Sequence, residues 1–177
     1  MTHAQDESVQ IRTAKSFEIE LIRRIERTSA SRYLGTDRAS LAEDEPTDTT
    51  TLAQRIAEDG LLAAVVGDGP PVAFVMFREV EGCGYVEQID VLPSHAGRRI
   101  GARLLDAVAD LGRGRGWPAL TLSTFRDVPF NAPYYRRLGF VDLPDAALTP
   151  GLAEIRAEHL ARGLDETTRV FMRRPIG

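Results

Sequence analysis

The chain has 177 residues and a formal net charge of −4, and its 19.5 kDa suit a single domain (residues 1–177) that can bury a sizeable core. A mean hydropathy of −0.19 with 27% charged residues argues against a disordered or membrane-spanning chain, and the polar first residues do not resemble a signal peptide. The single cysteine, Cys83, excludes an intrachain disulfide and a cysteine-based zinc cluster. We therefore expect a soluble cytoplasmic protein with no membrane partner.

Charge is distributed unevenly along the chain. Residues 41–60 contain six acidic side chains against one arginine, a balance of −5, whereas residues 95–116 contain five arginines against two aspartates, a balance of +3. Nucleic-acid binding would require more positive charge than this. One basic stretch in an acidic protein suits a small anionic ligand instead.

The first third of the sequence predicts a strand and two helices. The strand is Val9–Ala14, and Ser16 caps a helix that fades near Tyr33–Gly35. A polar, acidic loop at Thr36–Pro46 leads to a second, short helix that ends at Gly60. The apolar residues that mark the buried faces are Phe17, Leu21, Ile22 and Ile25 in the first helix, and Leu52 and Ile56 in the second.

The remaining sequence alternates strands with helices. Two almost wholly apolar strands, Leu61–Val66 and Val72–Phe77, belong at the centre of a sheet. A third strand, Tyr85–Val91, follows a turn at 82–84 and alternates, with Glu87 on the face opposite Asp90. The later elements are the helices Arg99–Gly112, Asn131–Leu138 and Leu152–Arg162 and the strands Ala119–Thr124, Phe140–Leu143 and Arg169–Arg173. Hairpins imply antiparallel strands, and the strand-helix-strand unit at 85–124 implies one parallel pair.

The segment Val91–Leu105 (VLPSHAGRRIGARLL) is the most informative one for chemistry. A strand ends at a proline, a loop with glycines and arginines follows, and an amphipathic helix begins. Exposed amides at such a helix start form an anion site, to which Arg98 and Arg99 add charge. Neither a P-loop nor a dinucleotide-binding motif fits this spacing. The alternative is an ordinary strand-to-helix turn whose arginines are solvated.

A second segment, Pro129–Phe140 (PFNAPYYRRLGF), together with this loop, resembles the GNAT superfamily of acyl-CoA-dependent N-acetyltransferases. The likeness rests on V-x-P followed by the glycine/arginine loop, on N-x-x-x-Y-x-x-x-G-F at Asn131–Phe140, and on the order of elements over nearly the whole chain. The resemblance implies an α/β (α+β) fold: a mixed, mostly antiparallel, twisted sheet of six or seven strands flanked by helices.

The sequence departs from the family pattern at three places. In the usual Q/R-x-x-G-x-G/A loop, Ala96 replaces the Gln or Arg, and Arg99 replaces the middle glycine. Because Arg99 starts a helix, we expect it to need no positive φ. The segment Pro144–Glu166 inserts a helix where the family often has a tight hairpin.

The resemblance implies direct attack of a substrate amine on the thioester of acetyl-CoA, the expected co-substrate. No metal is expected, because no pair of His, Cys or carboxylate residues has metal-site spacing. Tyr135 matches the family tyrosine and is the candidate general acid; a packed aromatic with a satisfied hydroxyl is the alternative. Glu87 is the candidate base, because partial burial would favour proton acceptance. It could instead pair with an arginine or act through a water.

Several residues are expected to hold the cofactor. The resemblance assigns the thioester and pantetheine to the strand edge at Ile89 and Val91, and Asn131 either touches the pantetheine arm or caps its short helix. The pyrophosphate would lie on the loop and helix start formed by Gly97, Arg98, Arg99, Ile100, Gly101 and Ala102. Ser123 and Thr124 would line the substrate side, whereas His159 is expected at the surface of a late helix.

The expected activity is acetylation of a primary amine of a small molecule or peptide, not of nucleic acid. The resemblance to the family also suggests a homodimer. The rival function is a non-catalytic acyl-CoA-binding or sensing module on the same fold, which Ala96 favours and the pair Tyr135 and Glu87 disfavours.

Overall fold

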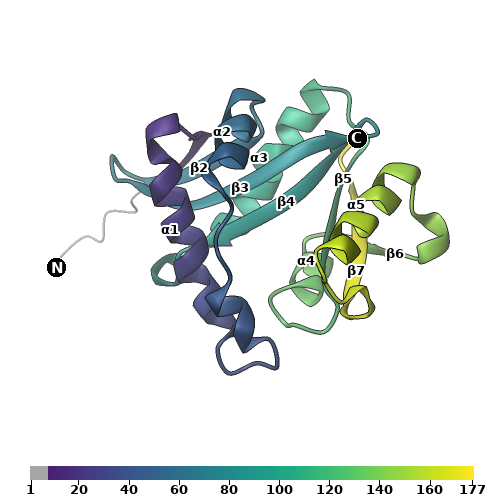
Figure 1. The fold of residues 1–177 in the computed structure, drawn as a ribbon. Helices are drawn as coiled ribbons and strands as arrows, with labels where there is room; N and C mark the ends of the chain where they lie inside the picture. The colour runs from purple at the N-terminus through teal and green to yellow at the C-terminus, as the bar shows by residue number, and fades with distance from the viewer. Residues whose placement is uncertain (1–7) are drawn as a thin grey trace. The chain divides into compact units, whose positions relative to one another are not determined.

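The computed structural model describes residues 8–177, and its strands form one seven-stranded sheet in the order β1-β2-β3-β4-β5-β7-β6 (Figure 1). Strands β4 and β5 pair in parallel, whereas β1–β2, β2–β3, β5–β7 and β6–β7 pair antiparallel. The strands are β1 (Val9–Thr13), β2 (Leu61–Val66), β3 (Pro71–Val80), β4 (Cys83–Val91), β5 (Ala119–Phe125), β6 (Val141–Leu143) and β7 (Arg169–Pro175). The predicted mixed sheet with a parallel pair around residues 85–124 is confirmed.

Five α-helices accompany the sheet in the described part of the chain: α1 (Ile19–Ser29), α2 (Thr49–Ala57), α3 (Ile100–Gly114), α4 (Ala132–Arg137) and α5 (Pro150–Ala161). Two expectations differ in detail. The predicted loop 36–46 contains a 3-10 turn at Ala39–Glu43. Helix α3 continues through Gly112, where a Cβ would lie 2.8 Å from both Ile176 and Trp117, so this glycine serves packing and does not stop the helix.

The chain divides into two compact units. The first comprises the chain up to Phe77 together with Gln88–Ala107, and the second comprises Arg78–Glu87 and Val108–Gly177. The boundary falls inside β3, β4 and α3 rather than in a linker.

In the first unit, α1 and α2 pack on β2 and β3. Ile22 and Ile25 of α1 and Leu52 of α2 are buried against Leu61, Ala63, Phe74 and Met76 of the strands. Phe17, predicted on the buried face, is instead 78% exposed. Residues Ser16–Glu18 form a 3-10 turn that changes the helical phase, and Glu18 takes the buried position.

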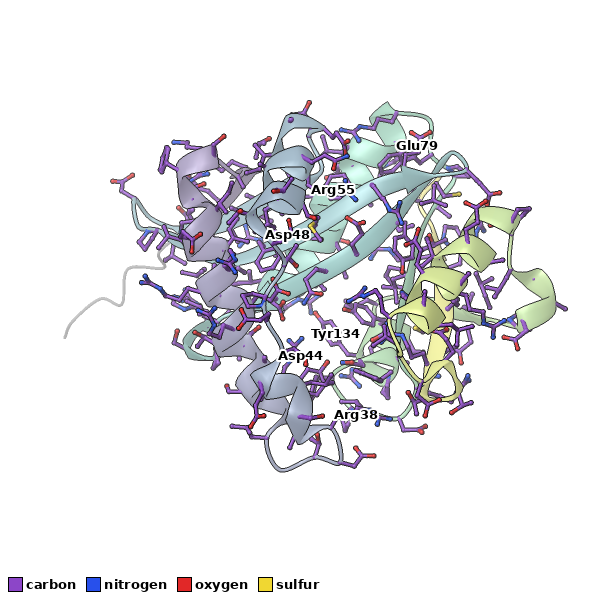
Figure 2. The ribbon with its side chains drawn as sticks, viewed as in Figure 1. Arg38, Asp44, Asp48, Arg55, Glu79 and Tyr134 are labelled. Atoms are coloured by element: carbon purple, nitrogen blue, oxygen red, sulfur yellow. The ribbon has the colours of Figure 1, made fainter. Side chains whose placement is uncertain are left out.

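Charged groups fix the starts of α1 and α2 in this unit. The buried Glu18 carboxylate accepts hydrogen bonds from Arg12 (2.6 and 2.9 Å) and from the Lys15 amide, and the Arg12 bond holds the pKa of Glu18 below its usual value. Asp48 (Figure 2) caps α2 by accepting from the Thr51 amide at 2.8 Å, which likewise lowers its pKa. The sequence had placed the first cap at Ser16, where no side-chain cap is made.

In the second unit, α5 packs on the sheet through Leu152 and Ile155, which contact Tyr85 and Phe171. The β3–β4 hairpin turns at Glu81 and Gly82, with φ of 50° and 73°, so β4 begins at Cys83, two residues before the predicted start. Gly84 is then a strand residue. A Cβ there would lie 2.5 Å from the Trp117 ring, which packs across it while its Nε1 donates to Glu79 (2.8 Å; Glu79 labelled in Figure 2).

Candidate functional site

The loop between β4 and α3 has two residues with left-handed backbone. After a 3-10 turn at Pro93–His95, Gly97 has φ 75° and Arg99 has φ 58°, and α3 begins at Ile100. The expectation that Arg99 needs no positive φ is therefore wrong. The helix proper begins one residue later, and Arg99 occupies a conformation that costs a non-glycine residue about 1 kcal/mol. The family's usual glycine suits this position because glycine adopts a positive φ without steric cost.

The start of α3 offers backbone amides and two arginines. Gly97, Arg98 and Arg99 are exposed, and among residues 8–177, apart from the two chain neighbours of Gly97, no atom lies within 4 Å of the position that a Gly97 Cβ would take. Ile100, Gly101 and Ala102 are buried, so these three positions can meet a ligand only through their main chain. The first amides of a helix lack partners within the helix and carry the positive end of its dipole. This loop has the chemistry of an anion site.

Strand β4 leads into that loop and carries Ile89 and Val91, both half-buried. Asp90 lies between them on the opposite face and is 2% exposed. Its carboxylate accepts from Ser29 Oγ (2.7 Å) and Gln88 Nε2 (2.5 Å) and pairs with Arg32 Nη2 (2.9 Å). Burial nevertheless raises the pKa of Asp90.

A second acid belongs to the same side of the first unit. Glu26 of α1 accepts from the backbone amide of Thr47 at 3.0 Å and from its hydroxyl at 3.2 Å, and burial raises the pKa of Glu26. Sequence reasoning singled out neither Glu26 nor Asp90. The signal available for Asp90 was a carboxylate that follows Val86 and Gln88 on one face of a strand expected inside the sheet.

Glu87 lies in the second unit, with its side chain 16% exposed. Its Oε1 lies 3.0 Å from Nε of Arg78, so an ion pair with an arginine, one of the two interpretations left open, is present. Tyr85, two residues earlier on the same face, is buried, and desolvation raises the pKa of its hydroxyl far above the ordinary value. Tyr85 therefore stays protonated at any physiological pH.

Tyr135 lies on α4 and is half-buried. Its ring meets the rings of Phe140 (centroids 5.7 Å apart) and Tyr134 (5.5 Å) edge-on, and its carbonyl accepts from the Phe140 amide at 3.1 Å. Gly139, with φ 91°, makes this return of the chain possible. The Y-x-x-x-G-F spacing thus packs Tyr135 against Phe140. Tyr134 (Figure 2) lies next to the guanidinium of Arg137 instead.

Asn131 is buried at the N-cap position of α4. Its backbone carbonyl accepts from the Tyr135 amide at 3.0 Å, but its side chain makes no capping hydrogen bond. Capping, one of the two roles considered for this side chain, is therefore not what it does here.

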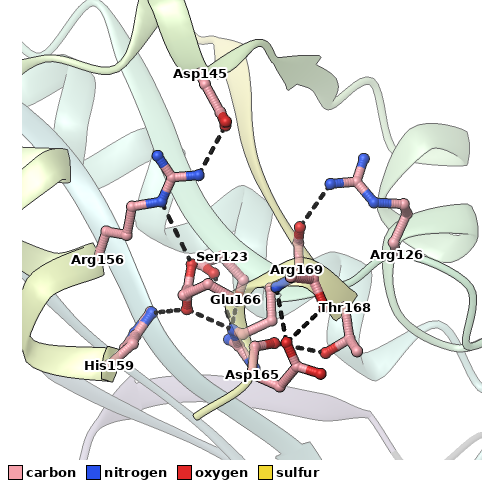
Figure 3. Close-up of polar contacts among 10 residues, drawn as sticks. Ser123, Arg126, Asp145, Arg156, His159, Asp165, Glu166, Thr168 and Arg169 are labelled. Atoms are coloured by element: carbon pink, nitrogen blue, oxygen red, sulfur yellow. Dashed lines mark hydrogen bonds and ion pairs between the residues drawn. The ribbon is translucent and has the colours of Figure 1, made fainter. Parts of the chain in front are cut away.

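A polar network of the second unit joins residues of α5, β5 and β7 (Figure 3). Glu166 accepts from or pairs with His159 (2.7 Å), Arg169 (3.6 Å) and Arg156 (3.9 Å). Arg169 Nε also donates to Ser123 Oγ at 3.2 Å. His159, expected at the surface, is buried and stacked on Phe171, and burial followed by the Arg169 charge lowers its pKa.

The two units divide the predicted site residues between them. Ile89, Val91 and the loop 97–102 belong to the first, and Glu87, Asn131 and Tyr135 belong to the second. Among residues 8–177, no group of three or more His, Cys, Asp or Glu side chains is arranged to hold a metal ion. No helix in the same range has the length and apolar character needed to cross a membrane.

Comparison with known proteins identifies the family. Residues 21–140 match the model of the acetyltransferase (GNAT) family. Because the match covers more than half of the chain, the protein belongs to the GNAT family of acetyltransferases.

Solved structures show the same fold at low sequence identity. N-acetylglutamate synthase from Neisseria gonorrhoeae superposes with a TM-score of 0.74 at 18% identity over 98% of this chain, which spans only 36% of that protein. The PaiA N-acetyltransferase from Thermoplasma acidophilum gives 0.70 at 16% identity, covering 95% of this chain and 99% of that one. The ribosomal-protein-S18-alanine N-acetyltransferase from Escherichia coli gives 0.65 at 18% identity, covering 96% and 95%. The predicted fold class is confirmed.

Proposed function

We propose that the protein, as a single functional domain, transfers an acetyl group from acetyl-CoA to a primary amine of a small molecule or peptide. The observation that carries the proposal is the loop in which Gly97 and Arg99 adopt positive φ immediately before α3. Family membership supports it. The N. gonorrhoeae and T. acidophilum structures contain coenzyme A, and the E. coli protein is named for an alanine acceptor.

The loop fits a pyrophosphate. The backbone amides of residues 97–102 and the exposed guanidinium groups of Arg98 and Arg99 supply donors and positive charge, and the open space beside Gly97 admits the phosphates. Ile89 and Val91 would hold the pantetheine and thioester through their main chain, and Asn131 would contact the pantetheine arm. The arginines thus replace the side-chain contact that Ala96 lacks.

Two side chains of the second unit would move the protons. A neutral amine nitrogen attacks the thioester carbonyl, the C–N bond forms and the C–S bond breaks. Glu87 accepts a proton from the amine, directly or through a water, and Tyr135 donates one to the departing thiolate. Glu87 Oε1 pairs with Arg78, so the carboxylate accepts the proton either at Oε2 or at Oε1 after the ion pair with Arg78 opens.

A thiol-release assay with acetyl-CoA and a panel of amines tests the proposal. Tyr135→Phe should lower kcat by about 10²-fold or more, as expected for loss of a general acid, and leave the Kd for CoA unchanged. Tyr134→Phe is the matched control and should keep full activity. An unchanged kcat in Tyr135→Phe would remove the acid role.

The rival function, an acyl-CoA-binding module, gives a different result in the same assay. It predicts tight CoA binding with no turnover of any amine, and this outcome would contradict the proposed acetyltransferase activity. Replacing both Arg98 and Arg99 with Ala should weaken CoA binding at least several-fold under either function, because two phosphate contacts are lost. An unaffected Kd would mean that the loop binds through its backbone alone.

A further inference from the structure

Arg78 connects Glu87 to the inserted helix α5. Its Nε lies 3.0 Å from Oε1 of Glu87, and its Nη2 lies 3.5 Å from Oε2 of Glu158 on α5. The Nε–H of Arg78 is buried and has no aligned hydrogen-bond acceptor, so the contact with Glu87 is an ion pair of adjustable geometry. One guanidinium therefore serves two carboxylates, a shielded one on β4 and a solvent-exposed one on α5.

Helix α5 is fixed independently of this contact. Leu152 and Ile155 pack against the sheet, and Arg156 bridges Asp145 (2.8 Å) and Glu166 (3.9 Å), as Figure 3 shows. The core packing of Leu152 and Ile155 is enough to hold the helix, so Glu158 reaches Arg78 from a rigid support even without the Arg156 contacts. The pairing of Arg78 with Glu158 is thus set by the fold of the insertion.

We propose that Arg78 is a positioning residue for Glu87 and that Glu158, supplied by the inserted helix, adjusts how strongly Arg78 acts on it. The proposal rests on the base role of Glu87 in the proposed function. A guanidinium beside a carboxylate favours its ionised form, which is the form that accepts a proton, and restricts its orientation. Glu158 draws on the same cation and adds negative charge, which opposes that effect.

Four other titratable groups of the second unit, Tyr85, Glu166, Arg169 and His159, add little net charge around Tyr85 and Glu87. Tyr85 lies beside Glu87 on β4 and stays neutral, because burial raises the pKa of its hydroxyl. Arg169 and Glu166, which also act on Tyr85, carry opposite charges 3.6 Å apart, so their fields largely cancel. Burial lowers the pKa of His159 of α5, which favours its neutral form. Arg78 is a cation in contact with Glu87, and Glu158 is an acid that shares this cation.

The test is the acidic limb of the pH profile of kcat, measured on the full-length enzyme with acetyl-CoA and an accepted amine. Arg78→Gln should move this limb to higher pH and lower kcat several-fold, with the KM for acetyl-CoA unchanged. Glu158→Gln should move it to lower pH, and Arg78→Lys should restore most of the wild-type limb. Opposite shifts from two members of one contact are not expected of a merely structural role.

Arg156→Gln is the matched control. Arg156 is 32% exposed, as Arg78 is, and also bridges two carboxylates, but neither of them is Glu87. The acidic limb of the pH profile of kcat should stay in place in Arg156→Gln. Equal shifts of this limb in Arg78→Gln and Arg156→Gln, or no shift in Arg78→Gln, overturn the positioning role. If Arg78→Gln does not fold, Glu158→Gln decides alone, and an unmoved limb there overturns the proposal.

Glu87→Gln separates the two levels of inference. Loss of the acidic limb in this variant, with an unmoved limb in Arg78→Gln, overturns the positioning role and leaves the base role standing. A limb that persists in Glu87→Gln overturns both the base role and the role of Arg78, while acetyl transfer itself is judged by thiol release.

Discussion

The two faces of β4 each carry a carboxylate, and the two carboxylates differ in burial and in their polar partners. On one face Asp90 is almost completely buried, and its carboxylate accepts hydrogen bonds from Ser29 and Gln88 and forms an ion pair with Arg32. On the other, three residues earlier, Glu87 is partly exposed and shares the guanidinium of Arg78 with a second acid. A carboxylate enclosed by donors stabilises a fold, whereas one with a shared and loosely aligned partner remains available for chemistry. Proximity on one strand therefore says little about role.

The largest expected difference is in stability. Asp90→Ala leaves the Ser29 hydroxyl and Arg32 without their buried acceptor, and it should lower the free energy of unfolding by about 2–3 kcal/mol. Glu87→Ala should lower it by less than about 1 kcal/mol, because its ion pair is partly solvated. Urea unfolding followed by circular dichroism measures both. Similar losses in the two variants would end the distinction between the two faces.

A smaller difference is expected from the arginine partners. Arg32 and Arg78 are similarly exposed, at 34% and 32% of their side chains. Arg32→Ala leaves a buried charge without its counterion and should cost about 1–2 kcal/mol, whereas Arg78→Ala should cost about 0.5 kcal/mol. Since the two arginines match in exposure, the gap reports the burial of the carboxylate that each one serves. A gap of zero would mean that Ser29 and Gln88 suffice for Asp90.

Much of this arrangement was predictable from the sequence, and the failures have physical causes. Alternation along β4 placed Glu87 and Asp90 on opposite faces, and the apolar runs located β2 and β3 correctly. No sequence rule pairs Asp90 with Ser29 and Arg32, because these contacts join residues about sixty positions apart. The burial of His159 depends in the same way on Phe171, a partner on another element.

Phe17 and Arg99 show a second kind of failure. In both cases a helix was predicted to begin earlier than it does: Phe17 lies in the 3-10 turn Ser16–Glu18 that precedes α1, and Arg99, just before α3, has a positive φ. Side-chain periodicity fixes a helix face well and its first turn poorly. At Arg99 this error concerned the very loop on which the proposed function depends.

The pH dependence of stability offers a third test of the buried face. Because burial raises the pKa of Asp90 above its unfolded value of about 3.9, the folded protein keeps this proton while the unfolded chain loses it. Its contribution is therefore fully present below that pH and is lost as the pH rises through the folded pKa. The stability of wild type relative to Asp90→Asn should fall with pH over this window, as measured by urea unfolding from pH 3.5 upwards. A difference that rises with pH would mean that the three donors outweigh burial.

The smallest expected effect concerns the backbone of the loop that follows β4. Arg99→Gly removes the strain of a positive φ but adds freedom to the unfolded chain, and the two effects nearly cancel, within about 0.5 kcal/mol. Arg98 is also exposed, but its φ is not positive. Arg98→Gly therefore only adds conformational freedom to the unfolded chain, and it should lower the free energy of unfolding by about 0.5–1 kcal/mol. Arg99→Val should be the least stable of the three, because a β-branched residue tolerates positive φ poorly. Equal losses from the two glycine variants would show that Arg99 is not strained, and its replacement of the family's glycine would then owe nothing to backbone geometry.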